Sequence, residues 1–341
     1  QAFVPVLSEY RERGGDLLVR ELVARVTGTL GITLLLLTVG VVLFSPVFAA
    51  IFAPTWFFSS PDKFAATASM LRITFPYLLF ISMTGIAAGV LNSYDRFAVP
   101  AFTPMLLNIT LIASALIAAP WFTEPAFALA WGVLAAGAIQ LVFQLPFLQR
   151  IHLLQKPVID WQHSGVRKIL ALMAPAIFGV SVTQINLLLD TMLATFLPTG
   201  SVSWLYYSDR LAQLPLGVFG VAIATVILPN LSRQYANQAE GSYSSILGWA
   251  IKMVLLVSVP AALALILLAY PILTTLFFYG DVMTVRDMQM SAMSLRAYAL
   301  GLVAFMLIKV LAPGFFARQD MTSPVRFGII AMIINMILNV L

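Results

Sequence analysis

Four charged residues, Asp190, Asp209, Arg210 and Lys309, interrupt long apolar stretches of this sequence. An ionised side chain at the centre of a lipid bilayer costs about 2.5–3.5 kcal/mol on insertion scales, so it usually faces a partner or a wet cavity. Arginine suits a phosphate in such a cavity, because its planar guanidinium can donate to two oxygens at once. The residue types therefore suggest binding of an anion at membrane depth.

Three polar residues, Thr183, Asn186 and Asp190, are spaced by three and four, which places them on one face of a helix. Arg210 follows after a short connection at residues 198–202, so its helix is expected to be an antiparallel neighbour with Arg210 at the depth of Asp190. Two interpretations remain open. The two charges form a structural ion pair, or Arg210 binds an anionic substrate and Asp190 holds it in place.

A bend is expected beyond the arginine, at Pro215, Gly217 and Gly220. Proline removes a helix hydrogen bond, and glycine is a poor helix former. The bend could serve gating or only packing. Asp209 and Lys309 are further candidate cavity charges, although the long side chain of Lys309 could also extend to the nearby interface.

The composition limits the class of protein. Of 341 residues, 61% are hydrophobic and only 10% are charged, whereas a soluble domain has about 25% charged residues. An ordinary soluble enzyme and a disordered chain are thus excluded. The chain has no cysteine, and it carries no P-loop, HExxH, GxSxG or Rossmann glycine pattern. We therefore expect neither enzymatic catalysis nor a bound metal or cofactor.

The apolar residues come in solid runs, which favour transmembrane helices over the alternating segments of a barrel. A polytopic all-α membrane protein is predicted, with nine spans in this chain. They cover approximately residues 26–52, 69–92, 101–119, 126–148, 168–197, 203–229, 245–278, 290–316 and 325–341.

The basic residues indicate the orientation of these spans. One side would hold Arg11, Arg13, Arg20, Arg25, Arg96, Arg150, Lys156, Arg167, Lys168, Arg233, Arg318 and Arg326. The other side would hold Lys63, Arg72, Arg286 and Arg296. The positive-inside rule makes the first side cytoplasmic. The net charge of +5 is then a sign of topology, and no nucleic-acid partner is expected. Residues 150–167 suggest an interfacial helix.

Residues of the same type recur at a constant separation along the chain, which indicates an internal repeat. Pro5 and Pro229 are separated by the same interval as Ser8 and Ser232. Six predicted spans lie between the copies, so both have the same orientation, as in transporters with parallel halves. We expect two parallel six-helix lobes around a central cavity, with residues 1–150 in the first and 151–341 in the second. Because the first copy would begin before residue 1, we expect the chain to be a fragment.

Four stretches resemble the MurJ (MviN) family of lipid II flippases, in the multidrug/oligosaccharidyl-lipid/polysaccharide exporter superfamily. They are QAFVP at 1–5, GSVSWLYYSDRL at 200–211, LPLGVFGVA at 214–222 and KVLAPGFFARQD at 309–320. The resemblance covers essentially the whole chain. It implies two six-helix lobes plus two further helices in the complete protein.

The resemblance also implies a function. Members move a lipid-linked peptidoglycan precursor from the cytoplasmic to the outer leaflet of the bacterial inner membrane, and a cationic cavity binds its pyrophosphate and sugars. Arg210 matches the family's arginine on the eighth helix, whereas the other cavity arginines would precede residue 1. The expected partners are this lipid-linked substrate and membrane lipids, and the expected state is a monomer that works by alternating access.

Two other functions remain open from the residues. A cation-coupled multidrug exporter of the same superfamily would need an acidic cavity, with Asp190 as the coupling group. A channel or a structural membrane protein would lack the two-state change in cavity access. The source of energy for transport is not indicated by the sequence.

Overall fold

The computed structural model is helical, and the part of the chain that it describes contains no strand. This part comprises residues 3–220, 222–223, 227, 231, 240–280, 282–318, 320 and 322–340. Within it, nothing is described of the side chains of residues 175, 176, 178–180, 182, 183, 186, 240, 316, 339 and 340. The expected all-α class is confirmed.

The chain divides into two compact units, Gln1–Leu188 and Leu189–Leu341. The division falls inside one long helix, α8 (Ser164–Ala194). The repeat in the sequence instead suggested a boundary near residue 150. The units are called N-terminal and C-terminal below. The two six-helix lobes, divided near residue 150, remain a prediction.

The N-terminal unit is built of helices only. In chain order they are α1 (Phe3–Leu43), α2 (Ser45–Phe52), α3 (Pro54–Ser59), α4 (Pro61–Thr74), α5 (Tyr77–Ser93), α6 (Ala98–Ala113), the short turns η1 (Ser114–Ala118) and η2 (Ala119–Trp121), α7 (Pro125–Arg150) and the first part of α8.

Two of the predicted spans are interrupted in this unit. The span at 26–52 ends as α1 at Leu43, and α2 restarts at Ser45 with Pro46 in its first turn. The span at 69–92 is split between α4 and α5 at Pro76. Proline lacks the amide hydrogen that continues a helix ladder, so both breaks have a local cause.

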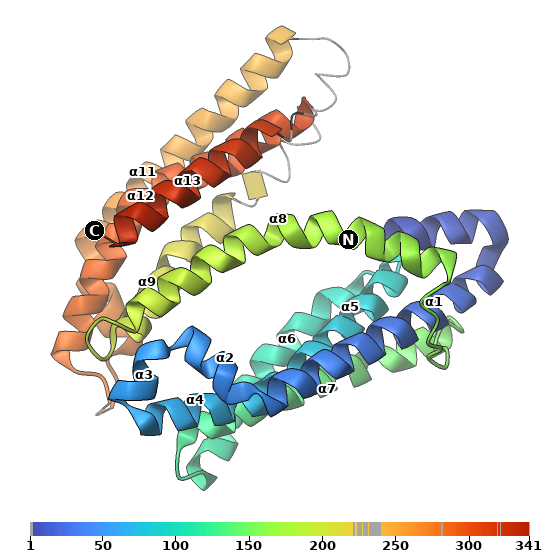
Figure 1. Ribbon diagram of the computed structural model, residues 1–341. Helices are drawn as coiled ribbons and strands as arrows, with labels where there is room; N and C mark the ends of the chain where they lie inside the picture. Colours follow the sequence, from blue (N-terminus) through green and yellow to red (C-terminus); the bar gives the residue numbers. More distant parts are fainter. Residues whose placement is uncertain are drawn as a thin grey trace. The chain divides into compact units, whose positions relative to one another are not determined.

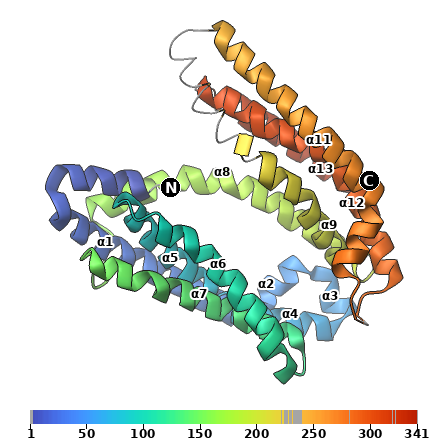
Figure 2. The same cartoon turned by 180° about the vertical axis from the view of Figure 1, so that it is seen from behind.

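The helices α5, α6 and α7 pack side by side, and α1 runs along α5 (Figures 1 and 2). Their core is apolar, with Leu7, Leu22, Val90 and Leu91 fully buried. Burial of such side chains stabilises the unit by roughly 1.5–3 kcal/mol for each large one.

A buried polar contact joins α6 to α7 inside this apolar surrounding. The Gln144 amide donates to the Thr103 hydroxyl at 2.8 Å, and the Gln140 amide donates to the Thr103 carbonyl at 3.1 Å. Thr103 precedes Pro104, which lies inside α6. The two glutamines thus fasten α6 where its own hydrogen-bond ladder is weakened.

The segment 151–163, called the connecting segment below, joins α7 to α8 and contains no helix. Its Val158 N–H donates to the Ala24 carbonyl at 2.9 Å, and its Asp160 N–H donates to the Thr29 hydroxyl at 3.0 Å. The prediction of an interfacial helix at residues 150–167 is therefore wrong over this segment. The amides of Val158 and Asp160 bond to α1 instead of to an internal helix ladder.

The connecting segment approaches α1 very closely at Gly28. A Cβ atom at Gly28 would lie 2.3 Å from the Val158 carbonyl oxygen, so only glycine fits there. Arg25, one turn earlier on α1, forms an ion pair with Asp160 at 3.0 Å. Backbone contact and charge together fix the segment on α1.

The C-terminal unit contains the end of α8, α9 (Ser201–Pro215), the π-helical turn η3 (Leu216–Gly220), α11 (Glu240–Phe277), α12 (Val285–Ala317) and α13 (Thr322–Val340). Helices α11 and α12 lie side by side in both views (Figures 1 and 2). Leu273, Leu295, Leu302 and Met306 are fully buried in the core between them.

Six stretches of the described residues are long and apolar enough to cross a membrane: Phe3–Leu43, Pro61–Ser93, Ala98–Trp121, Pro125–Arg150, Gly241–Phe277 and Val285–Phe315. The stretch Thr322–Leu338 is a shorter apolar helix. The chain is thus a polytopic helical membrane protein, as expected. The count of nine spans remains a prediction, since the expected span at 203–229 extends outside the described residues.

Candidate functional site

Helix α9 presents two different faces. One is buried and contains Trp204, Ser208, Ala212 and Pro215, at the spacing of successive helix turns. Tyr206, Arg210 and Leu214 form a second row at the same spacing, and all three are exposed. The sequence therefore uses one face of α9 for packing and leaves the arginine on the other.

The buried face is fastened to α12 by polar contacts. The indole N–H of Trp204 donates to the Asp287 carboxylate at 2.8 Å, and the Ser208 hydroxyl donates to the Ser291 carbonyl at 2.8 Å. Gly200 precedes α9 with φ +107°, and a Cβ there would lie 2.7 Å from the Trp204 ring. The beginning of α9 thus has a defined position on α12.

The guanidinium of Arg210 lies over the Tyr206 ring, 5.0 Å from the ring centre. A guanidinium stacked on an aromatic face keeps its edge free to donate hydrogen bonds. The ion pairs between described residues do not include one between Arg210 and Asp190. Whether Asp190 and Arg210 act as a structural ion pair or together in substrate binding remains a prediction.

Asp209, the neighbour of Arg210 in sequence, is half-buried and accepts a hydrogen bond from the Gln213 amide at 2.6 Å. The amide lies one turn later on α9, so this contact is local. It holds the carboxylate along the helix. The role of Asp209 in a cavity remains a prediction.

The predicted bend falls where the helix is irregular. Pro215 ends α9, and the next five residues form the π-helical turn η3, which contains Gly217 and Gly220. A Cβ at Gly220 would lie 3.6 Å from Cγ of Lys309 on α12. Short π-helical turns occur often at functional sites. Lys309 is exposed and its stem lies beside this turn, but a gating role for the turn remains a prediction.

Asp190 lines a cavity of about 500 Å³ in the C-terminal unit, with polar walls from Tyr298 on α12 and Asn335 on α13. Phe196 and Leu205 contribute to its apolar walls. Asp190 is half-buried. A carboxylate, a phenol and an amide suit a polar or cationic group, whereas Arg210, which does not line this cavity, suits an anion. The cavity includes Asp190 without Arg210, and joint action of the two charges remains a prediction.

Thr183 and Asn186, the other expected polar residues on the helix of Asp190, have side chains outside the described part of the chain. Tyr298 and Asn335 were not identified from the sequence, because both are distant from Asp190 along the chain. Tyr206 was also missed, although its spacing of four from Arg210 on one helix was a usable signal. Among the described residues, no group of three or more His, Cys, Asp or Glu side chains could hold a metal ion.

A protein-family model described as lipid II flippase MurJ matches residues 1–341. The chain belongs to this family. The family is one of transporters, and the resemblance expected from residues 200–222 and 309–320 is confirmed by a match over the entire sequence.

Individual relatives agree with the family model. The probable lipid II flippase MurJ of Haemophilus influenzae is 48% identical over 353 residues, which cover 100% of this chain and 69% of the relative. That of Vibrio cholerae is 47% identical over 345 residues, 99% of this chain and 66% of the relative. The lipid II flippase MurJ of Burkholderia cenocepacia is 40% identical over 344 residues, again 99% and 66%. The chain thus spans about two thirds of the length of these relatives.

Proposed function

We propose that this chain is the central part of a transporter that moves lipid II, a lipid-linked peptidoglycan precursor, from the cytoplasmic to the outer leaflet. The single observation that carries the proposal is the family match over residues 1–341. The relatives named above are described as lipid II flippases or probable ones. The exposed arginine of the membrane-spanning C-terminal unit is consistent with a pyrophosphate-bearing substrate.

Arg210 is the residue of this chain to which we assign the pyrophosphate. The Tyr206 ring beneath the guanidinium limits the orientations of the arginine side chain. The edge of the guanidinium can then donate two parallel hydrogen bonds to phosphate oxygens. No covalent bond of the substrate changes in this role, so no catalytic residue is required.

Transport by alternating access requires one part of the protein to move against another. In our proposal, the outer part of α9 stays with α12 through Trp204 and Ser208, and the turn η3 absorbs the change of direction below Arg210. Single π-helical turns inside α-helices are frequent at functional sites. Arg210 would thereby face the two sides of the membrane in turn.

The proposed location is the bacterial cytoplasmic membrane, with the basic loops in the cytoplasm. Arg96, Arg150 and the connecting segment with Lys156 would lie on that side. We further propose that the protein acts as a monomer. We propose no nucleic-acid partner, because the topology explains the positive charge.

The test uses the complete protein in cells that depend on it for lipid II transport. The measured quantity is the fraction of lipid II headgroups that a membrane-impermeant reagent can reach at the outer surface. Arg210→Ala should lower this fraction about 10–100-fold, the effect of losing one or two charge-assisted hydrogen bonds. Arg210→Lys should retain part of the activity, since it keeps the charge and loses the fork.

Arg286→Ala is the matched control, because Arg286 is an exposed arginine of the same unit outside the candidate site. This variant should transport normally. Wild-type headgroup delivery by Arg210→Ala would refute the assignment of the pyrophosphate. Extrusion of a cationic dye that requires Asp190, without any lipid II transport, would instead identify a drug exporter.

A further inference from the structure

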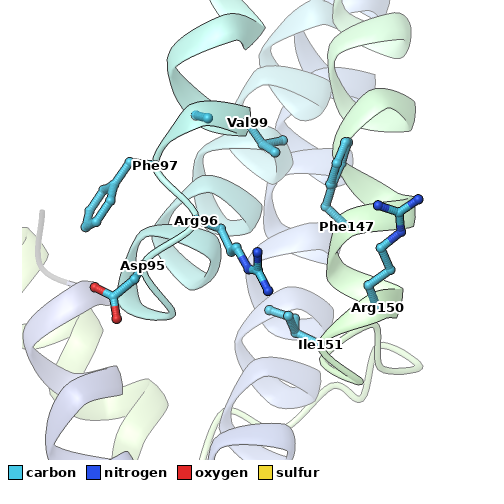
Figure 3. Close-up of a pocket in the computed structure, with 8 residues that line it drawn as sticks. Asp95, Arg96, Phe97, Val99, Phe147, Arg150 and Ile151 are labelled. Atoms are coloured by element: carbon cyan, nitrogen blue, oxygen red, sulfur yellow. The ribbon is translucent and has the colours of Figure 1, made fainter.

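A pocket of about 330 Å³ lies in the N-terminal unit, where the turn after α5 meets the end of α7 (Figure 3). One wall is the turn between α5 and α6, with Arg96, Phe97 and Val99. The other wall is the end of α7, with Phe147 and Arg150. Arg96 and Arg150 both lie in the basic set that we place on the cytoplasmic side, at the boundary between spanning helices and their loops.

The turn that carries Arg96 has a defined backbone. Asp95 adopts φ +59°, and the Arg96 N–H donates to the Leu91 carbonyl at 2.9 Å, which is the Schellman pattern for the end of a helix. In Figure 3 the Arg96 side chain extends toward Ile151 at the end of α7. The Asp95 carboxylate points away from it. The one acidic residue of the pocket thus does not neutralise its arginines.

Several features favour an anion in this pocket. Arg96 and Arg150 are exposed, and neither takes part in the ion pairs found between described residues. The Arg150 guanidinium lies 5.5 Å from the centre of the Phe147 ring. The first residues of α6 line the pocket, and no side chain caps that helix. An uncapped helix N-terminus adds partial positive charge from its free amide groups.

An aromatic strip continues from the pocket along α6 and α7. The rings of Phe147 and Phe143 are 5.5 Å apart, and those of Phe143 and Phe102 are 5.6 Å apart. Phe102 is 41% exposed. Since α6 and α7 lie in stretches able to cross the membrane, this strip is at the depth of lipid chains. A free anion would fill the charged end and leave the strip unused.

We propose that this pocket binds one anionic phospholipid, with its phosphate at Arg96 and Arg150 and one acyl chain along Phe147, Phe143 and Phe102. A zwitterionic lipid is disfavoured, because its ammonium group would approach the two guanidinium groups. The site is independent of the proposed transport function, since its residues belong to the other unit.

The test is a native mass spectrometry titration of the complete protein in detergent, with phosphatidylglycerol or phosphatidylcholine as the added lipid. The wild type should bind the first phosphatidylglycerol about tenfold more tightly than phosphatidylcholine. The double variant Arg96→Ala/Arg150→Ala should bind the two lipids equally. Asp95→Asn should bind phosphatidylglycerol about twofold more tightly, since it removes an exposed like charge and asparagine tolerates positive φ.

Arg286→Ala/Arg326→Ala is the matched control, because it removes two exposed arginines elsewhere and lowers the net charge equally. It should retain the preference for phosphatidylglycerol. Equal binding of both lipids by the wild type, or the same loss in the control, would overturn the proposal. So would complete displacement of phosphatidylglycerol by excess inorganic phosphate, which would indicate a site for a free anion. If the double variant unfolds, the test is the tighter binding of phosphatidylglycerol expected of Asp95→Asn. Unchanged binding by Asp95→Asn would then refute the site.

Discussion

The two units of this protein hold their charged residues in different ways. In the N-terminal unit, several charges bind each other, as in the pairs Arg25–Asp160 and Arg25–Glu21. In the described part of the C-terminal unit, neutral groups contact three of the charged residues. A tyrosine ring supports Arg210, a glutamine amide bonds to Asp209 and an indole bonds to Asp287.

The difference separates structural charges from charges that can meet a ligand. An ion pair compensates the charge of both partners, whereas a ring or a single amide leaves the charge available to a ligand. We therefore expect substitution of an ion-paired residue such as Arg25 to affect mainly stability, and substitution of Arg210 to affect mainly transport. The following predictions test this contrast.

The largest effect is expected at the closest contact of the N-terminal unit. Gly28→Val should destabilise the protein by about 3 kcal/mol, because overpacking against a backbone that cannot move aside is costly. In the C-terminal unit, a Cβ at Gly217 would have no atom within 4 Å. Gly217→Val should therefore lower the free energy of unfolding by less than half as much. Thermal unfolding in detergent measures both. Equal losses would contradict the close docking of the connecting segment.

The next contrast compares two arginines. Arg25→Ala should lower stability by about 1 kcal/mol, since two partly exposed ion pairs are lost, and should leave lipid II transport per folded molecule within about twofold of wild type. Arg210→Ala should show the opposite pattern, with unchanged thermal unfolding and lost transport. Both quantities are measured on the same preparations. A loss of transport in both variants at equal stability would remove the distinction between the units.

A smaller effect is expected where α9 is fastened to α12. Trp204→Phe should destabilise by about 1 kcal/mol, because it removes the hydrogen bond to Asp287 while keeping most of the ring. Trp131→Phe is the control, since Trp131 is 50% exposed and lies on a spanning helix. If transport needs the outer end of α9 held on α12, Trp204→Phe should also reduce it, and a fully active Trp204→Phe would remove that requirement.

The smallest effect concerns Tyr94, beyond the end of α5, which donates a hydrogen bond to Asp16 at 2.7 Å. Burial and this contact raise the pKa of the Tyr94 hydroxyl to about 12. Folding thus favours the neutral phenol, and its stabilisation is present below pH 10 and is lost as the pH rises through about 12. Asp16→Asn should shift one tyrosine titration, followed by ultraviolet absorbance, to lower pH. Tyr94→Phe should remove that step, and an unchanged titration in Asp16→Asn would refute the contact.

Local chemistry explains which features the sequence could predict. Solid apolar runs can only be buried or placed in lipid, so the helical membrane class followed directly. Pro215 and the following glycines weaken a helix wherever it lies, so the irregular turn was found at the expected position. The helix of residues 150–167 was predicted from composition alone. It failed because the amides of Val158 and Asp160 bond to α1, a partner more than a hundred residues earlier in the chain.

By itself, the sequence determined the helical membrane class, the family and the arginine that we assign to the substrate. These depend on residue types and on spacing within single helices. Only the tertiary structure decided which charges meet. It placed Arg210 on Tyr206, gave Asp190 a cavity with Tyr298 and Asn335, and brought Arg96 and Arg150 to one pocket. The physical reason is that electrostatic interactions act over a few ångströms, and only the packing of helices sets those distances between residues far apart in the chain.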